Sequence, residues 1–363
     1  MKLPISKKYE GSQAKLANAN EPGVRSKTLR HLLAGSLFGF GLLALFIRET
    51  DLSLEQLAEF TLDWTYLTGY LLTIIVFTAI RAIRLHLMLS LDAPHRVLGT
   101  LFTQATVRDL LPGWVGEPVL IWLLKRWNGI EMGAATSALF VYRFIELSIY
   151  TICFLVAGSF FVAVLPHSLS IAGIVVCLVV LFVPLGLHYS SALNGLVRQR
   201  INGHQETASA EDSSRASLPG VSRYFDALRA FANQFLRTAV SIVKPRTYYN
   251  ATFLSLLSIA VLVAGFFFVI KALDQTVSFA LCAVVFALQL PISVLPIRAV
   301  ANIGTHEVGW LYALILLGYS EADAGVLAVH THLIFLIGTL FKFACAVVAL
   351  LLIRQFSSKP VRE

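Results

Sequence analysis

Apolar stretches of helix length recur along the chain, and they constrain its fold more than any other feature. The expected spans run over 29–47, 65–85, 133–165, 169–189, 248–271 and 323–353. A bilayer offers the backbone no water to bond, so a spanning segment must be a helix or part of a closed barrel, and a helix needs about 20 apolar residues. Since 57% of the residues are hydrophobic and only 14% are charged, we expect an all-α polytopic membrane protein.

One apolar segment, 98–124, is interrupted where it would otherwise cross the membrane. Pro112 and Pro118 fix φ and lack N–H donors, and Gly116 allows tight backbone between them. Glu117 stands where the second apolar run begins, so the pattern predicts two half-helices that meet at an acidic tip. We interpret the segment as a re-entrant broken-helix hairpin, and an ordinary surface loop between two spans is the alternative.

The segment 278–319 repeats the same order of features around a second glutamate, Glu307. A Leu-Pro pair precedes each glutamate, and an apolar run, a glycine and then polar residues inside an apolar helix follow it. The ordered set favours an internal duplication, with chance similarity of two apolar stretches as the alternative. The corresponding residues are Leu111-Pro112 and Leu295-Pro296, Glu117 and Glu307, Gly129 and Gly318, and Arg143 with Glu146 and His330 with His332.

Charged residues flank these segments unevenly and predict their orientation, because basic loops stay on the cytoplasmic side. Basic flanks make the hairpin at 98–124 enter from the cytoplasm, and acidic flanks make the hairpin at 278–319 enter from outside. Each half then holds three spans and one hairpin. Because three crossings are an odd number, the second half starts on the opposite side of the membrane from the first, so we expect two inverted repeats, as in many secondary transporters. A parallel arrangement with eight full spans is the alternative.

The charge bias also predicts an inner (plasma) membrane protein with both termini in the cytoplasm. Apolar residues at helical spacing over 221–243 predict an amphipathic helix, either on the inner leaflet or packed on protein. The expected segments are a disordered basic tail at 1–28, a first repeat at 29–165, a second repeat at 169–353 with a cytoplasmic loop at 190–247, and a tail at 354–363.

Ionisable residues inside the apolar segments are the candidate binding residues. A charge at the centre of a spanning helix costs about 2.5–3.5 kcal/mol, so these groups should pair or line a wet cavity. Arginine and half-helix N-termini bind phosphate groups well. The predicted substrate-binding residues are Arg108, Glu117, Arg143, Glu146, Arg298, His306, Glu307 and His330. By contrast, Arg81 and Arg84 end an apolar stretch and are expected only to anchor the inner interface.

Each assignment also has a purely structural alternative. Arg143 and Glu146 are three residues apart on one helix face and can form an ion pair that only neutralises itself. Glu117 and Glu307 can act as caps at the positive ends of half-helices. Any single histidine can be a packing residue rather than a proton carrier.

No pattern typical of a nucleotide, metal or cofactor site occurs in the sequence. There is no Gly-rich phosphate loop, no His-Glu-x-x-His and no paired Cys/His set. The four cysteines all fall inside apolar runs, as packing residues do. The net charge of +8 lies mainly in the tails and one loop, where it sets orientation. We therefore expect no cofactor, no metal and no nucleic-acid partner.

Several motifs together resemble the lysylphosphatidylglycerol synthase transmembrane family, also called flippase-like, over roughly residues 30–353. The resemblance implies movement of a lipid or lipid-linked head group between leaflets, in a cavity lined by Glu117, Arg143, Glu146 and Glu307. Larger family members carry a soluble aminoacyl-transferase domain, which we do not expect here. The motifs are Leu110-Leu111-Pro112, Gly116-Glu117, Lys125-Arg126, Tyr142-Arg143-Phe144-Ile145-Glu146 and Ile303-Gly304-Thr305-His306-Glu307.

Two departures from the family pattern imply a head group different from the family's best-known lipid. The family often has a basic residue at the position of Trp114 and a second basic residue near the position of Leu120. Glu146 stands where an aspartate is common in the family. We expect a translocase for an anionic lipid or lipid-linked head group in cell-envelope lipid or glycan assembly, driven by an ion gradient or by none. Envelope-synthesis proteins are its expected partners. The alternatives are a membrane-embedded transferase acting on polyprenyl-phosphate-linked substrates and a non-catalytic envelope-synthesis scaffold.

Overall fold

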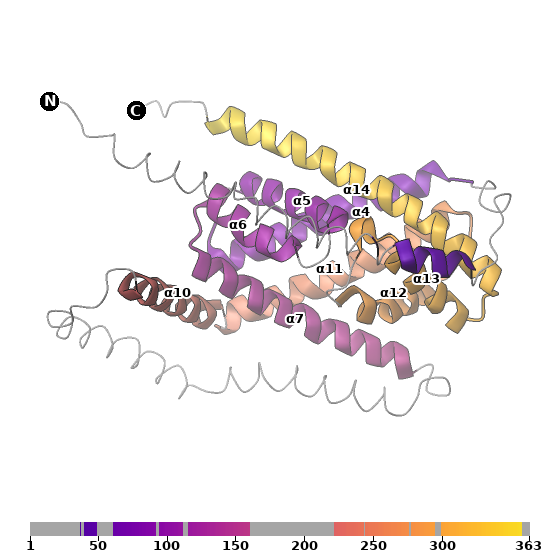
Figure 1. The fold of residues 1–363 in the computed structure, drawn as a ribbon, viewed down its shortest axis with the longest axis horizontal. Helices are drawn as coiled ribbons and strands as arrows, with labels where there is room; N and C mark the ends of the chain where they lie inside the picture. Colours follow the sequence, from indigo (N-terminus) through magenta and orange to yellow (C-terminus); the bar gives the residue numbers. More distant parts are fainter. Residues whose placement is uncertain are drawn as a thin grey trace, which may run out of the picture.

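The computed structural model describes residues 37, 40–48, 61–91, 94–111, 115–159, 221–242, 244–275, 277–294 and 299–357. Helices make up all of the regular structure in these ranges, and no strand occurs among them. The labelled helices are α4 (Trp64–Leu89), α5 (Pro94–Leu110), α6 (Gly116–Asn128), α7 (Met132–Ser159), α10 (Val221–Ile242), α11 (Pro245–Ala272), α12 (Phe279–Val294), the 3-10 helix η1 (Val300–Asn302), α13 (Thr305–Leu316) and α14 (Glu321–Ser357) (Figure 1).

Four of these helices are long and apolar enough to cross a membrane: Trp64–Leu89, Met132–Phe154, Arg246–Ala272 and Glu321–Ile353. The all-α membrane class predicted from the sequence is therefore confirmed. Predicted spans at 29–47 and 169–189 and the loop at 190–220 lie wholly or largely outside the described residues.

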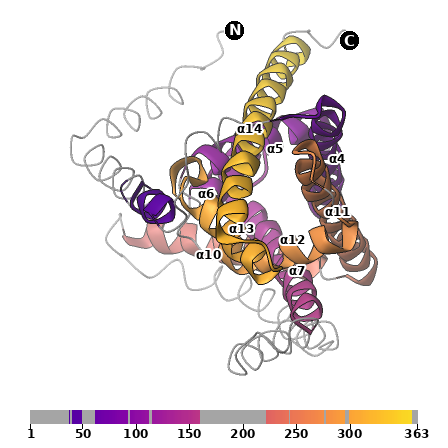
Figure 2. The ribbon, with the colours of Figure 1, turned by 90° about the vertical axis from the view of Figure 1, so that its right-hand side faces the viewer.

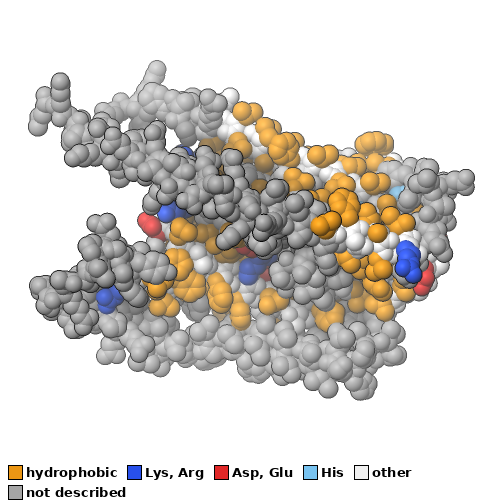
Figure 3. All heavy atoms as spheres, viewed as in Figure 1, with side chains coloured by type: hydrophobic (Ala, Val, Ile, Leu, Met, Phe, Trp, Pro, Cys, Tyr) orange, Lys and Arg blue, Asp and Glu red, His pale blue; other side chains and the backbone are white. Residues whose placement is uncertain are grey.

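The outer face of α14 is apolar, as contact with lipid requires. Leu340, Phe343 and Leu351 expose 68%, 54% and 56% of their surface. Figure 3 shows apolar side chains over much of the described surface on the visible face, with charged groups gathered in a few places. Water would oppose exposure of this kind over so many residues, so the surface fits a bilayer.

Helices α4 and α11 form a central antiparallel pair. At one end the N–H of Asp63, which caps α4, donates to the carbonyl of Ala272 (2.9 Å). Further along, a Cβ at Gly69 would lie 3.0 Å from the ring of Phe268, so the absence of a side chain allows the close approach. At the other end Arg84 donates to Ser255.

Short helices occupy both of the interrupted segments. The first pair, α5 and α6, has 17 and 13 residues, and the second, α12 and α13, has 16 and 12. All four are shorter than the 20 or so residues that a span needs. The partners in each pair pack on one another. The predicted breaks are therefore present, with α6 beginning at Gly116 and η1 standing between α12 and α13.

The two halves of the chain interlock. Helix α7, which follows the first short pair, packs on α12 of the second, and α14, which follows the second pair, packs on α5 of the first (Figure 2). The short helix η1 also contacts α5. The contacts of α7 with α12 and of α14 with α5 are therefore reciprocal between the two halves.

Helix α10 matches the amphipathic helix predicted at 221–243. It packs on α7, where Phe235 meets Phe140 edge-on at 6.1 Å. A Cβ at Gly133 would lie 2.8 Å from the carbonyl oxygen of Phe231, so the two backbones are close. Of the two expected settings for this helix, the structure shows packing on protein, while Leu228 stays 51% exposed.

Candidate functional site

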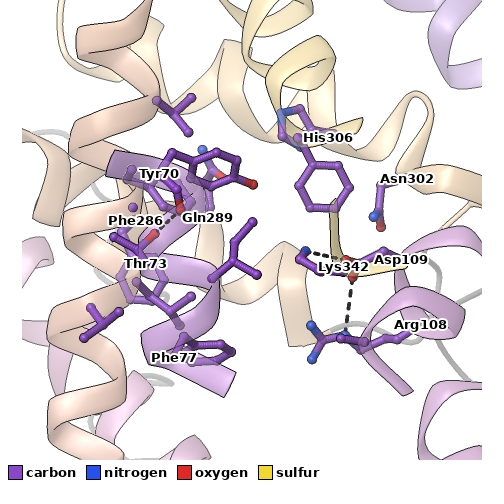
Figure 4. A pocket seen from close by; sticks show the side chains of 18 of the residues that line it. Tyr70, Thr73, Phe77, Arg108, Asp109, Phe286, Gln289, Asn302, His306 and Lys342 are labelled. Carbon is purple, nitrogen blue, oxygen red and sulfur yellow. Dashed lines mark hydrogen bonds and ion pairs between the residues drawn. The ribbon is translucent and has the colours of Figure 1, made fainter. Parts of the chain in front are cut away.

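A cavity of about 580 Å³ lies between the two short-helix pairs and the central helices. In Figure 4 the aromatic and hydroxyl side chains of Tyr70, Thr73 and Phe77 lie on one side of an open space, and Arg108 and Lys342 lie on the facing side. Its charged lining residues are Arg81, Arg108, Asp109, Glu117, Arg143, Glu146 and Lys342, and its large apolar ones include Phe77, Leu262, Phe266, Phe286, Trp310 and Phe335. The cavity is therefore amphiphilic.

An ion-pair network connects three helices at the cavity. Glu146 on α7 accepts from Arg84 on α4 and from Arg143, both at 2.9 Å. Arg143 also pairs with Glu117 at the start of α6. The Arg143–Glu146 pair predicted from the spacing is thus confirmed, and it does more than neutralise itself. Because Glu146 is shared, the network ties α6 and α4 to the same point of α7.

Arg81 and Arg84 correct one expectation. They were expected at the membrane interface, yet they are only 1% and 0% exposed. Arg81 donates to the hydroxyl of Tyr142 at 2.8 Å, and the Arg84 guanidinium lies 3.7 Å from the centre of the same ring. The prediction was wrong because α4 does not end near residue 85 but continues to Leu89, which keeps both arginines within the packed helix.

A second ion pair joins α5 to α14. Lys342 Nζ lies 2.6 Å from Asp109 Oδ2, and the Asp109 side chain is 3% exposed. Arg108 Nε lies 3.5 Å from the other oxygen of Asp109. No other partner of Arg108 occurs in the described part of the chain, and Figure 4 shows its end group pointing into the cavity. Arg108 therefore presents free donors to whatever occupies the cavity.

Gly116 holds Arg108 in place through close packing. A Cβ at this position would lie 2.8 Å from both Cβ and Cγ of Arg108. Only glycine lets the first residue of α6 approach α5 so closely. The Gly-Glu motif therefore has two separate roles, since Gly116 packs on Arg108 and Glu117 pairs with Arg143.

A third cluster joins α13 to α14. Glu307 Oε1 lies 2.6 Å from His332 Nδ1, and Glu307 Oε2 accepts from the N–H of Gly304 at 2.8 Å. His332 Nε2 lies 3.0 Å from the carbonyl oxygen of Ala301. Glu307 thus caps the start of α13, one of its expected roles, and also holds a histidine.

The turn next to this cluster is strained. Ala301 and Asn302 both have left-handed backbone, with φ of 52° and 59°. For residues with a side chain such a conformation costs roughly 1–3 kcal/mol each, so surrounding contacts must hold it. The bond from His332 to Ala301 is one of them, and the hydroxyl of Thr305, which donates to the carbonyl of Asn302 at 3.0 Å, is another.

The cavity brings together five of the sequence-predicted residues. Two more are buried outside its lining, and Arg298 lies outside the described residues. The five are Arg108, Glu117, Arg143, Glu146 and His306, and the two are Glu307 and His330. The cavity residues that sequence reasoning left out of the site include Arg81, Asp109, Gln289, Trp310 and Lys342. For Arg81, Asp109 and Lys342 the signal was a charge within an apolar stretch, whereas Gln289 and Trp310 carried none.

Two residues of the cavity lining carry buried donors without a partner among the described residues. Gln289 Nε2 and Trp310 Nε1 are buried and form no hydrogen bond to any described residue. The same holds for Glu117 Oε2, an acceptor. Buried polar atoms are nearly always bonded, so these three are polar atoms of the lining residues whose hydrogen-bonding capacity is unused in the described structure. In the part of the chain that is described, no three His, Cys, Asp or Glu side chains gather closely enough to hold a metal ion.

Comparison with known proteins gave one match. A family model described as the lysylphosphatidylglycerol synthase TM region matches residues 32–359. No curated protein and no solved structure matched the chain.

Proposed function

The chain belongs to the lysylphosphatidylglycerol synthase TM-region family, whose model covers residues 32–359 of the 363, and from this premise we propose that it moves an anionic lipid or lipid-linked head group between leaflets. The family and the apolar helices make it a membrane, lipid-related protein. Translocation itself is our proposal, as are the inner membrane and the cytoplasmic termini.

The single observation that carries the proposal is the cavity with both charged and aromatic walls. A lipid in transit needs a polar place for its head group and an apolar surface for its chains. Arg108 and Lys342 face the aromatic side of the same 580 Å³ space. A cavity serving only water or a small ion would gain nothing from the rings of Phe266 and Phe286, which meet edge-on at 5.3 Å.

Arg108 is the residue that we assign to the head group. Arg143 is already bound by Glu117 and Glu146, and Lys342 is bound by Asp109. Arg108 has only its 3.5 Å contact with Asp109, so its two terminal nitrogens remain for a ligand. A guanidinium binds phosphate with two parallel hydrogen bonds, which suits a phosphodiester.

The helix packing supports two inverted repeats around this cavity. The corresponding helices α4 and α11 run antiparallel, as copies inverted in the membrane must. The reciprocal packing of α7 on α12 and of α14 on α5 fits the same relation. We propose that α5–α6 and α12–α13 are re-entrant hairpins and that their tips meet at the cavity, where η1 contacts α5.

Lipid exchange in vesicles tests the proposal. Purified protein would be placed in phosphatidylcholine vesicles with a trace of phosphatidylglycerol labelled on its acyl chain, and dithionite would report the outer-leaflet fraction. We expect exchange above that of protein-free vesicles. Arg108→Gln should slow it at least about tenfold, the effect of losing one charged hydrogen-bonding partner.

Arg237→Gln, an exposed arginine on α10, is the matched control and should exchange like the unaltered protein. Equal rates with and without protein would reject translocation of this lipid class. Product formation from a polyprenyl-phosphate substrate in detergent would favour the transferase alternative instead.

A further inference from the structure

We propose that Glu307 and His332 together bind one exchangeable proton, and that its release frees the tip of the second hairpin, Val300–Asn302, at the cavity. The coupling of this proton to translocation rests on the proposed function. The proton binding itself is argued only from the contacts of the pair. The pair lies between α13 and α14, and both side chains are nearly fully buried.

Hydrogen-bond accounting gives the proton count of the pair. His332 Nε2 faces a carbonyl oxygen, which can only accept, so this nitrogen must carry a proton. His332 Nδ1 faces Glu307 Oε1 at 2.6 Å, so one further proton must lie between these two atoms. The other oxygen of Glu307 already accepts from Gly304. With both protons in place every contact is satisfied and the pair carries no net charge.

Loss of one proton breaks this arrangement. A neutral imidazole has one N–H, so one nitrogen then directs a lone pair either at the carboxylate of Glu307 or at the carbonyl of Ala301. In each tautomer one of the two contacts becomes repulsive, and the pair gains a net charge of −1. Proton release therefore cannot leave both hydrogen bonds intact.

The contact with Ala301 holds a strained turn. Ala301 and Asn302 are left-handed residues with side chains. His332 holds the backbone of this tip at Ala301, and Glu307 holds the backbone just after the tip at Gly304. Asn302 itself lines the cavity, where Figure 4 shows it on the same side as Arg108 and Asp109. Release of the tip would therefore change the cavity wall next to the head-group position.

His306 gives the buried pair a connection to the cavity. Its ring stacks on His332 with centroids 4.7 Å apart, and His306 lines the cavity. Its Nε2 lies 3.3 Å from the hydroxyl of Thr331. His306 therefore lies between the buried pair and the cavity and is in direct ring contact with His332.

Several other ionisable groups face this region and bear on any pH dependence. His306 packs on the pair directly, and His330 lies two residues away on α14. Lys342 and Asp109 form their ion pair further along α14, with Arg108 beside it. Tyr70 of α4 lies against α14 at Gly338. A variant of Glu307 alone is therefore needed to assign the effect.

Glu307→Gln is that variant, because it mimics the protonated pair. The amide NH₂ would donate to Nδ1 of a neutral His332, and the amide oxygen would still accept from Gly304. All contacts that hold the tip would persist at every pH. The variant should fold, and it should lock the tip.

The experiment measures how fast a cysteine at the tip reacts. Val300→Cys would be introduced into the full chain with Cys153, Cys177, Cys282 and Cys345 replaced by alanine, and labelled in vesicles with a polar maleimide. Leu228→Cys on the exposed face of α10 corrects for the reactivity of the thiol itself. We expect the ratio of the two rates to rise about fivefold between about pH 6 and about pH 8.5. With Glu307→Gln the ratio should stay constant.

The proposed proton site would be overturned if the ratio of labelling rates rose equally with Glu307 and with Glu307→Gln, or if it rose with neither. Lipid exchange is measured separately on the same vesicles with an imposed pH difference, and Glu307→Gln should abolish any acceleration by that difference. If the unaltered protein exchanges no lipid, the proposed function fails, while the labelling ratio still decides whether the pair controls the tip.

Discussion

Lys342 and Asp109 form an ion pair at 2.6 Å across 233 residues of sequence, and this pair joins α5 to α14. The pair lies in the cavity wall beside Arg108. It therefore sets the position of the residue to which we assign the head group, and it also joins the two halves of the chain.

Removal of either partner of this pair should destabilise the protein. Asp109→Asn and Lys342→Met should each lower the free energy of unfolding by about 3 kcal/mol, because each breaks a buried ion pair and removes the nearest opposite charge from the group that remains. The double variant should lose less than the sum of the two, by about 2 kcal/mol. Unfolding in detergent would measure all three, and additive losses would show that the pair contributes nothing specific.

Gly116→Ala should displace Arg108. The new Cβ would lie 2.8 Å from two side-chain carbons of Arg108, and overpacking of this kind costs about 1–3 kcal/mol. We expect slower phosphatidylglycerol exchange and a lower melting temperature. Gly41→Ala is the control, since a Cβ there meets no described atom within 4 Å. An unchanged exchange rate in Gly116→Ala would separate this glycine from the head-group position.

Glu146→Ala should be among the most destabilising single changes. It would leave Arg84, which is 0% exposed, without its carboxylate, and a broken buried pair costs about 3–5 kcal/mol. The exposed Glu131 gives a matched comparison, and Glu131→Ala should stay within about 0.5 kcal/mol of the parent. Equal unfolding curves for the two variants would contradict the network described here.

Trp310→Phe should separate stability from ligand binding. The indole N–H bonds to no described residue, so its removal breaks no hydrogen bond, and the melting temperature should fall only by what the smaller ring leaves unfilled at this buried site. The ring contact with Phe266, stacked at 5.2 Å, would persist. If a lipid accepts a hydrogen bond from this donor, half-maximal exchange should need more labelled lipid. An unchanged requirement for labelled lipid would show that the indole N–H does not bind the lipid.

Cysteines at the bases of the two hairpins should report opposite sides of the membrane. Arg126→Cys at the end of α6 should react with a polar maleimide only from the cytoplasm, and Ser320→Cys before α14 only from outside. Both positions are exposed. Labelling of position 126 from outside would mean that the first interrupted segment crosses the membrane, as in the arrangement of eight full spans.

Sequence patterns located the elements well, because each pattern is local. Apolar length predicted α4, α11 and α14 to within a few residues at most ends, and the Pro-Gly break predicted the start of α6. The pair Arg143–Glu146 was predictable since helical spacing alone brings residues i and i+3 together.

Long-range partners could not be predicted in the same way. Nothing local to Asp109 indicates Lys342, and nothing local to Arg84 indicates Ser255 or Glu146. Arg81 and Arg84 were misplaced because the bias of basic residues toward membrane interfaces describes helix ends, whereas here Tyr142 supplies a ring and a hydroxyl for them inside the protein. Spacing could still have indicated a shared face, since the two arginines are three residues apart.

The exchange of covering helices between the halves means that neither half is a finished structure. Helix α5 packs on α14, and α12 packs on α7, so a fragment that stopped before α11 would leave α5 without one of its neighbours. The face of α5 that α14 covers would then be open to solvent or lipid, so each half depends on the other for complete packing.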